Sequence, residues 1–236
     1  MNEKTEKIYE NSKRHLLRFN EDLNALDINE YISERVLGGA SPATINLDLK
    51  VLRMLTGRKI KLLPVSFRLR FCSDEEISLL IQKADHELRL AIRIAIYTGL
   101  RKSNVFALKW NDLHDEYLTV IVKGNKQIYI PIHPELKEYL SRYRRENLLI
   151  YPEIFPFKHD WDRRFRRLAD SLGMEDVVFH TLRHTFISKL VMAGVDLRTV
   201  QELAGHASMR TTERYMHIST AHKQEKIKEL RYGNNL

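Results

Sequence analysis

Four short segments of the sequence carry side chains that could bind a phosphate group and transfer protons. They are TGLRKSNVFALKW at residues 98–110, VKGNK at 122–126, HTLRHT at 180–185 and LAGHASMRTTERYMH at 203–217. Arginine forks bind oxyanions, histidines exchange protons near neutral pH, and a tyrosine hydroxyl can act as a nucleophile. Each segment alone also has an ordinary structural explanation, such as an arginine at a helix end or a tyrosine in the core.

Together, in this order and at these spacings, the four segments resemble the tyrosine recombinases, the family of phage integrases and of bacterial dimer-resolving recombinases. The resemblance extends from about residue 70 to the C-terminus and is strongest over residues 178–218, which hold the H-x-x-R-H and G-H…Y patterns. It implies a mainly α fold with a small β-sheet (α+β) in the catalytic domain. It also implies a two-domain clamp with a small N-terminal helical domain.

The resemblance implies a catalytic role for six residues, which are Arg101, Lys123, His180, Arg183, His206 and Tyr215. The tyrosine is the nucleophile, the two arginines clamp the scissile phosphate, and the lysine at a hairpin tip protonates the leaving group. The first histidine assists proton transfer, and the second hydrogen-bonds the phosphate. The implied function is site-specific recombination, in which DNA strands are cleaved and rejoined through a 3′-phosphotyrosyl intermediate and a Holliday junction.

Physical chemistry supports this division of roles. A phenol has a pKa of about 10, so ionising it at pH 7 costs near 4 kcal/mol. Nearby guanidinium groups lower that cost, and a histidine can accept the proton. Attack on a phosphodiester builds charge on the non-bridging oxygens, and two arginines offer planar forks that stay cationic throughout. The departing 5′-oxygen needs a proton, which an ammonium group can supply.

The elements that must position these residues divide the chain into three parts. Residues 1–62 have helical period, and the resemblance implies that they form a reduced core-binding, DNA-binding domain. In this part Asp27 and Ser41 are predicted N-caps, and Gly57 is a predicted helix stop. Residues 63–72 lack helical period and are the predicted linker. Residues 73–236 are the predicted catalytic domain.

The catalytic part begins with a capping box, Ser73 with Glu76, and continues with an apolar helix that stops at Gly99. Arg101 falls just past this stop, where its side chain can be aimed at a cleft. The segment EYLTVIVKGNKQIYIPI at 116–132 predicts a hairpin with a Gly124-Asn125 turn. Near the C-terminus, Ser208 is expected to cap a short helix that carries Tyr215.

Other residues of the motifs keep ordinary interpretations. His184 is expected to pack or hydrogen-bond behind Arg183, and His217 to be a neighbour of the nucleophile. Asn104 stands where the family often has an acidic residue that would support Arg101. The polar segment 219–236, with Ile227 and Leu230 as docking residues, is a weak candidate for exchange between subunits.

The chain is basic, with a formal net charge of +8 and a pI near 9.5, which suits a phosphate-rich partner. We expect double-stranded DNA with specific recombination sites as the partner, bound by a homo-tetramer, and a monomer is one candidate form of the protein without DNA. An accessory DNA-bending protein is a further candidate. The predicted DNA contacts beyond the catalytic residues are Lys50, Arg53, Arg58, Lys59, Lys126, Arg163 and Arg164.

No cofactor or metal is expected. The sequence has neither a phosphate-binding G-x-x-x-x-G-K-[ST] motif nor clustered carboxylates near the four segments. The lone Cys72, the absence of a secretory signal and the absence of a long apolar run predict a cytoplasmic, nucleoid-associated protein without a membrane span.

Two other functions remain open at this point. A type IB topoisomerase-like enzyme would use the same cleavage chemistry to relax DNA, and it would act without sequence preference. A DNA-binding protein that has lost catalysis is the third option, although all six expected catalytic positions are filled.

Overall fold

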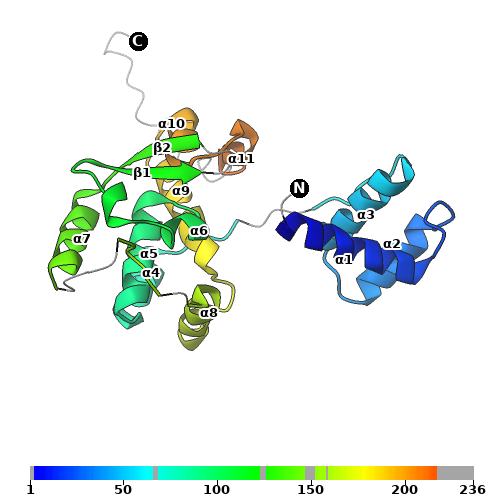
Figure 1. Cartoon of the computed structure of the whole chain (residues 1–236), viewed down its shortest axis with the longest axis horizontal. Helices are drawn as coiled ribbons and strands as arrows, with labels where there is room; N and C mark the ends of the chain where they lie inside the picture. The colour runs from blue at the N-terminus through cyan, green and yellow to red at the C-terminus, as the bar shows by residue number, and fades with distance from the viewer. Residues whose placement is uncertain (1–2, 66–68, 123–125, 147–151, 158, 217–236) are drawn as a thin grey trace, which may run out of the picture. The chain divides into compact units, whose positions relative to one another are not determined.

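The chain forms two compact units in the computed structural model, Met1–Arg68 and Leu69–Leu236. The structure describes residues 3–65, 69–122, 126–146, 152–157 and 159–216. Figure 1 shows the two units and labels their helices and strands. Each unit has its own hydrophobic core. Among the described residues, no helix has the length and apolar character that a membrane crossing requires.

The N-terminal unit consists of three helices in its described part: α1 (Glu3–Phe19), α2 (Ile28–Leu37) and α3 (Pro42–Thr56). The predicted caps are confirmed. Asp27 accepts hydrogen bonds from two backbone amides at the start of α2, and Ser41 does the same for Thr44 in α3. Gly57 ends α3 in the left-handed conformation, at φ 70°.

The core of this unit is apolar with one buried polar contact. Leu16, Ile45 and Leu49 are fully buried in it. The Tyr31 hydroxyl donates to Asp48 at 2.9 Å, and Arg35 donates to the same carboxylate at 3.1 Å. A carboxylate that is buried but paired with a guanidinium and a phenol keeps its hydrogen bonds, and it joins α2 to α3.

Both ends of the predicted linker, residues 63–72, are anchored to a folded unit. The Asn46 side chain donates to the Leu63 carbonyl at 2.9 Å and accepts from its amide at 2.7 Å, which holds residue 63 on α3. At the other end, Arg70 pairs with Glu76, and the Cys72 amide donates to Thr185 at 2.9 Å.

The C-terminal unit is mainly helical with one small sheet, as the sequence predicts. Its elements are α4 (Asp74–Lys83), α5 (His86–Thr98), α6 (Lys102–Val105), the 3-10 helix η1 (Trp110–Asp112), β1 (Tyr117–Val122), β2 (Lys126–Pro131), α7 (Pro134–Glu146), α8 (Trp161–Ser171), α9 (Phe179–Met192), α10 (Leu197–Ala204) and α11 (Met209–Glu213). The sequence analysis assigned no helix to residues 134–146, where α7 lies. The capping box of Ser73 and Glu76 and the left-handed stop at Gly99 are both present.

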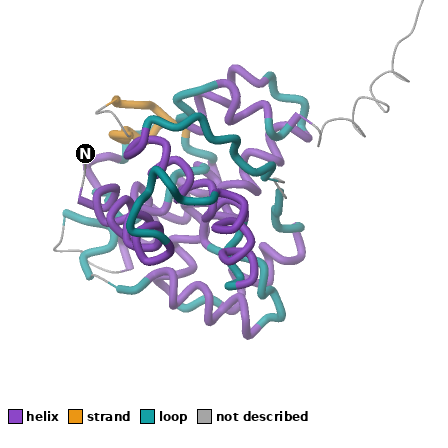
Figure 2. The backbone as a smooth tube through the Cα atoms, turned by 90° about the vertical axis from the view of Figure 1, so that its right-hand side faces the viewer, coloured by secondary structure: helices purple, strands orange, loops and turns teal. Residues whose placement is uncertain are grey.

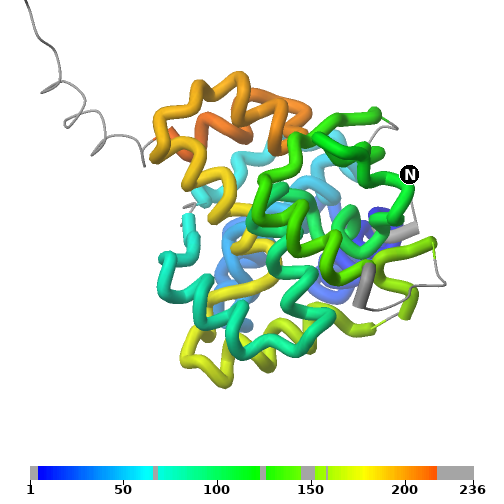
Figure 3. The backbone as a smooth tube through the Cα atoms, turned by 90° about the vertical axis from the view of Figure 1, so that its left-hand side faces the viewer, coloured from blue at the N-terminus to red at the C-terminus, as the bar shows by residue number. Residues whose placement is uncertain are grey.

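The two strands form an antiparallel hairpin, in which Leu118 lies opposite Ile130 and Val120 opposite Ile128. The ribbon is short among otherwise helical segments (Figure 2). Its turn residues 124 and 125 lie outside the described residues. Figures 1 and 3 show the hairpin beside α10 and α11. The contact is close, because a Cβ added to Gly205 would meet the Ile128 side chain at 3.0 Å.

Helix α5 is the centre of this unit, and it packs along α9. The main core gathers side chains from α4 to α9 around Leu90, Ile94 and Phe165. A second apolar cluster joins the C-terminal half of α9 to α10, and Tyr215 belongs to it with Ile187 and Val191. The ends of α5, α9 and α10 therefore meet at one place in the unit, and most of the predicted catalytic residues lie there.

Candidate active site

Arg183 is a buried arginine held by two backbone carbonyls. It lies in α9 with 4% of its surface exposed. Its terminal nitrogens donate to the carbonyl of Gly99 and the carbonyl of Ala204, both at 2.6 Å. These residues end α5 and α10, where helix carbonyls lack an intrahelical donor. The guanidinium thus ties the ends of α5 and α10 to α9, and its orientation is fixed.

Arg101 contacts the carbonyl of Gly205, the residue that follows Ala204. The arginine is half-buried at the start of α6, and it donates to this carbonyl at 3.4 Å. Burial, and then the nearby charge of Arg101, lowers the pKa of Arg183 to about 10. The Arg183 guanidinium therefore remains charged at neutral pH. No carboxylate pairs with either Arg101 or Arg183 within the described part of the chain.

The turn at Gly99 that separates α5 from Arg101 requires a glycine. Its φ is +62°, and a Cβ there would lie 2.2 Å from the Phe186 ring. Phe186 belongs to α9, so the missing side chain lets α9 approach the end of α5. That approach brings Arg183 within reach of the Gly99 carbonyl.

Tyr215 is buried, with 2% of its surface exposed, and its hydroxyl shares a hydrogen bond with Nδ1 of His184. This contact corrects the interpretation of His184 as a residue that supports Arg183 from behind. His184 follows Arg183 by one position on a helix, so its side chain points about 100° away around the axis and reaches the tyrosine instead. The rings lie 5.9 Å apart, centre to centre.

The hydrogen bond joins two neutral groups. Burial, and then the charges of His180 and Arg183, lowers the pKa of His184 to about 4. Burial raises the pKa of Tyr215 to about 12, although Arg183 and Arg214 act in the opposite direction. At pH 7 the tyrosine is therefore protonated, and a neutral imidazole with a lone pair can accept that proton.

The short helix α11 ends at Glu213, two residues before Tyr215, which lies in the following turn. Ser208 occupies the N-cap position as predicted, but its side chain makes no capping hydrogen bond. The tyrosine is fixed instead by the apolar cluster around it and by His184.

His206 is buried beside the two arginines. Its Nδ1 lies 2.9 Å from the Thr212 hydroxyl, and its carbonyl accepts from Gln201 at 3.1 Å. Burial, and then the charges of Arg183 and Arg101, lowers the pKa of His206 to about 4. Its ring is therefore neutral at pH 7. With Nδ1 bonded to a threonine, Nε2 is the nitrogen left to face a ligand.

His180 lies in the first turn of α9 with an exposed side chain, and its ring meets the edge of His184 at a centre-to-centre distance of 4.8 Å. Desolvation, followed by the charges of Arg183 and Arg101, lowers its pKa. His180 thus contacts His184, which in turn contacts the Tyr215 hydroxyl.

A cavity of about 790 Å³ opens beside this cluster, between the hairpin and α10. Arg101 and His206 line it from one side, and Lys126 and Tyr129 of the hairpin line it from another. Lys123, the predicted proton donor, lies outside the described residues, as do His217 and segment 219–236. Asn104 donates to the Ile121 carbonyl at 3.0 Å, so it holds α6 on the hairpin.

The predicted DNA contacts fall into two groups. Exposed side chains on their units belong to Lys50, Arg53, Lys59, Lys126 and Arg163. The other two are engaged within the protein. Arg58 donates to the carbonyls of Leu23 and Leu26, and Arg164 forms ion pairs with Asp85 and Glu87, both at 2.9 Å.

Comparison with known proteins identifies relatives of this chain. Residues 70–222 match the sequence profile of the "Phage integrase family". A tyrosine recombinase XerD of Lacticaseibacillus casei is 34% identical over 190 residues, which cover 71% of this chain and 63% of that protein. A tyrosine recombinase XerC of Staphylococcus carnosus (strain TM300) is 34% identical over 173 residues, 63% of this chain and 57% of the relative. The chain thus spans about three fifths of the length of these relatives.

The fold also has solved counterparts. A lambda integrase dimer bound to a COC′ core site superposes with a TM-score of 0.75 at 22% identity, over 92% of this chain and 72% of the other. At that identity the likeness establishes a shared fold.

Proposed function

This chain belongs to the phage integrase family of tyrosine recombinases, and we propose that it is a site-specific DNA recombinase that cleaves and rejoins DNA through a covalent phosphotyrosine. The observation that carries the proposal is the pairing of Arg101 and Arg183 at adjacent carbonyls with no carboxylate to neutralise them among the described residues. Two such guanidiniums bind an oxyanion strongly, and they gain most when its charge grows during the reaction.

Each residue of the cluster takes one role in the proposed reaction. The Tyr215 hydroxyl attacks the scissile phosphorus and forms a P–O bond, while the bond to the 5′-oxygen breaks. The two arginines bind the non-bridging oxygens, and His206 donates from Nε2 to one of them. Lys123 gives a proton to the departing oxygen. The phosphotyrosine conserves the free energy of the broken bond, so a 5′-hydroxyl can reseal the strand.

The proton of the phenol needs an acceptor, and two histidines share this task in the proposal. His184 already contacts the hydroxyl and is neutral at pH 7. His180, exposed beside it, assists when the hydroxyl has turned toward the phosphate. Because Tyr215 is 2% exposed, its turn must open before a duplex can be attacked. The hydrogen bond to His184 therefore keeps the Tyr215 hydroxyl buried in the protein without DNA.

The lambda integrase dimer is bound to a COC′ core site in its solved structure, which supports DNA as the partner of this chain. We propose double-stranded DNA as the substrate, a homo-tetramer as the recombining species, and the cytoplasmic nucleoid as the location. An accessory DNA-bending protein would act on the DNA and not in the active site. The reaction needs no cofactor, because the two arginines, the lysine and the histidines supply the charge and the protons.

Covalent trapping tests the proposal. Wild type and Tyr215→Phe are incubated with fragmented genomic DNA, denatured with SDS, and the protein-linked DNA is recovered and sequenced. We expect adducts with wild type only, enriched at one sequence. Adducts at every sequence would replace recombination by topoisomerase-like relaxation. Adducts that survive in Tyr215→Phe would overturn the assignment of the nucleophile, and binding without any adduct would leave a DNA-binding protein alone.

A further inference from the structure

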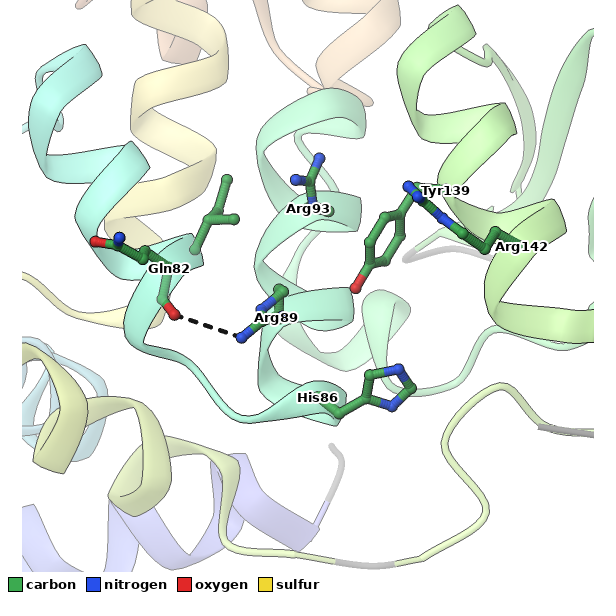
Figure 4. A pocket seen from close by; sticks show the side chains of 7 residues that line it. Gln82, His86, Arg89, Arg93, Tyr139 and Arg142 are labelled. Atoms are coloured by element: carbon green, nitrogen blue, oxygen red, sulfur yellow. Dashed lines mark hydrogen bonds between the residues drawn. The ribbon is translucent and has the colours of Figure 1, made fainter. Parts of the chain in front are cut away.

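A second cluster of arginines lies near the other end of α5. A cavity of about 430 Å³ between α4, α5 and α7 is lined by Gln82, His86, Arg89, Arg93, Tyr139 and Arg142. We call it the arginine pocket. Figure 4 shows Arg89 and Arg93 one turn apart on α5, across from Tyr139 and Arg142 on α7. The spacing of four residues places both α5 arginines on one face of the helix.

The three arginines have no acidic partner among the described residues, in contrast to Arg164 nearby in the fold. Arg93 lies 4.5 Å from the centre of the Tyr139 ring and Arg142 lies 5.8 Å from it. Their guanidinium carbons are therefore at most about 10 Å apart. Like charges at this separation repel each other, and an anion between them would relieve the repulsion.

Hydrogen-bond donors in the pocket also lack acceptors. The Nε atoms of Arg89 and Arg93 are buried and have no hydrogen-bond partner among the residues that the structure describes. Arg89 uses one terminal nitrogen on the Ala84 carbonyl at 2.8 Å, which fixes its orientation. A buried donor without an acceptor is unfavourable, so such donors are usually satisfied by protein, water or a ligand. These Nε atoms are closed off from solvent, so the donors that an oxyanion in the cavity would meet are the terminal guanidinium nitrogens of the lining arginines.

We propose that the arginine pocket binds a phosphate group, and that this phosphate belongs to the DNA backbone at a distance from the cleavage point. The assignment of this phosphate to DNA rests on the proposed function. Arg89 and Gly99 are ten residues apart on α5, which corresponds to about 15 Å along the helix axis. B-DNA rises about 3.4 Å per base pair, so this distance equals four to five base pairs. A duplex that runs along α5 would therefore place a phosphate near each end of the helix.

The alternative source of the phosphate is a small molecule. Guanidinium forks bind inorganic phosphate by the same bidentate hydrogen bonds, and Tyr139 and His86 would serve either ligand. The two sources differ in what they do to DNA binding. A backbone contact adds to the salt dependence of DNA affinity, whereas a site for a free phosphate leaves that dependence unchanged.

The test compares DNA affinity with direct detection of a ligand. Binding of an unspecific duplex of about 30 base pairs, enough to span both ends of α5 several times over, is measured from low to high salt for Tyr215→Phe, which prevents cleavage. The same is done after adding Arg142→Gln or Arg93→Gln to it. Arg144→Gln is the matched control, because Arg144 is exposed on α7 like Arg142 but lies over Trp110, outside the pocket. In parallel, the ¹⁵N-¹H signals of the arginine Nε–H groups are followed during titration with inorganic phosphate at constant ionic strength.

If the phosphate belongs to DNA, each pocket variant lowers the slope of log affinity against log salt by about 0.9, while the control leaves it unchanged. If the ligand is a small molecule, inorganic phosphate shifts the Nε–H signals of Arg89 and Arg93 in a saturable manner, but the slopes are equal; the phosphate site then stands and its source is corrected. Equal slopes together with unmoved Nε–H signals overturn the site. Because Arg142 is exposed, its variant is informative even if Arg93→Gln unfolds. Neither readout requires cleavage, so the result is independent of the covalent trapping.

Discussion

The two ends of α5 carry two clusters of arginines that are held in different ways. In the proposed active site, Arg183 donates to the carbonyls of Gly99 and Ala204, at the ends of α5 and α10. Arg101 donates to the carbonyl of Gly205, which follows α10. In the arginine pocket, Arg93 and Arg142 lie against the ring of Tyr139, and buried Nε donors remain unused. In neither cluster does a carboxylate of the described residues neutralise the arginines.

The difference concerns how much geometry each cluster fixes. A carbonyl is a directional acceptor that orients a planar guanidinium without neutralising it, whereas an aromatic face tolerates many orientations of a cation. The first arrangement suits a reacting phosphate, for which misplacement by about 1 Å is costly. The second suits a phosphate that only has to be bound. The comparison therefore predicts that the planar shape of the guanidinium matters in the active site, whereas its positive charge matters in the arginine pocket.

Arg183→Lys is expected to have the largest effect. Lysine keeps the charge but cannot donate to both Gly99 and Ala204 while it binds a phosphate, so the rate of adduct formation should fall by roughly 10²–10³. In the arginine pocket, Arg142→Lys should retain more DNA affinity than Arg142→Gln. The measurement is single-turnover trapping at saturating DNA, with DNA affinity measured separately. Equal activity of Arg183→Lys and wild type would break the comparison.

Gly99→Ala should damage the active-site end of α5 by moving one of its carbonyl anchors. The new Cβ would meet the Phe186 ring at 2.2 Å, and the left-handed conformation adds strain. We expect a loss of roughly 2–4 kcal/mol in the free energy of unfolding of the C-terminal unit, and a lower cleavage rate.

Gly57→Ala is the control for this change. Gly57 has a similar φ of +70° but no atom near its missing Cβ, so only about 1–2 kcal/mol of strain is expected. Denaturant unfolding measures both variants. A loss at Gly99 no larger than at Gly57 would mean that Phe186 moves aside and that the anchor is adaptable.

Acid should lower the unfolding free energy of the C-terminal unit through His184 and His206. His184 and His206 have folded pKa values of about 4, below the ordinary 6.5. The unfolded chain then binds more protons between these pH values, so stability is full above about pH 6.5 and is lost as pH falls toward 4. The loss is on the order of 2 kcal/mol for each histidine, after allowance for partial exposure. His184→Gln should flatten the dependence of the unfolding free energy on pH across this window, and an unchanged profile would contradict the neutral His184.

The smallest effect is expected at a third kind of arginine. Arg164 is already paired with Asp85 and Glu87, so Arg164→Gln should leave the salt slope of DNA binding unchanged and cost at most about 1 kcal/mol of stability. Arg163→Gln, on an exposed neighbour, should lower the slope by about 0.9 if that side chain contacts a phosphate. A lower slope for Arg164→Gln would show that DNA displaces its two carboxylates.

The sequence by itself determined most helix ends and the family, and it predicted which side chains react. Caps are local, so Asp27, Ser41, Ser73 and Gly99 mark helix ends that the structure confirms. The order of the four motifs was sufficient to recognise the family. The helix α7 was missed, although Leu136, Leu140 and Tyr143 recur at helical spacing and are buried.

Only the tertiary structure decided which groups touch. The two carbonyls that orient Arg183 lie 84 and 21 residues away in sequence, and the tyrosine that meets His184 lies 31 residues away. The adjacent positions of Arg183 and His184 in the sequence could not tell which of them faces Tyr215 until α10 and α11 were placed against α9. The arginine pocket arises in the same way, because its cations come from two helices separated by a hairpin. Helix ends follow from neighbouring residues, whereas a site follows from how those helices pack.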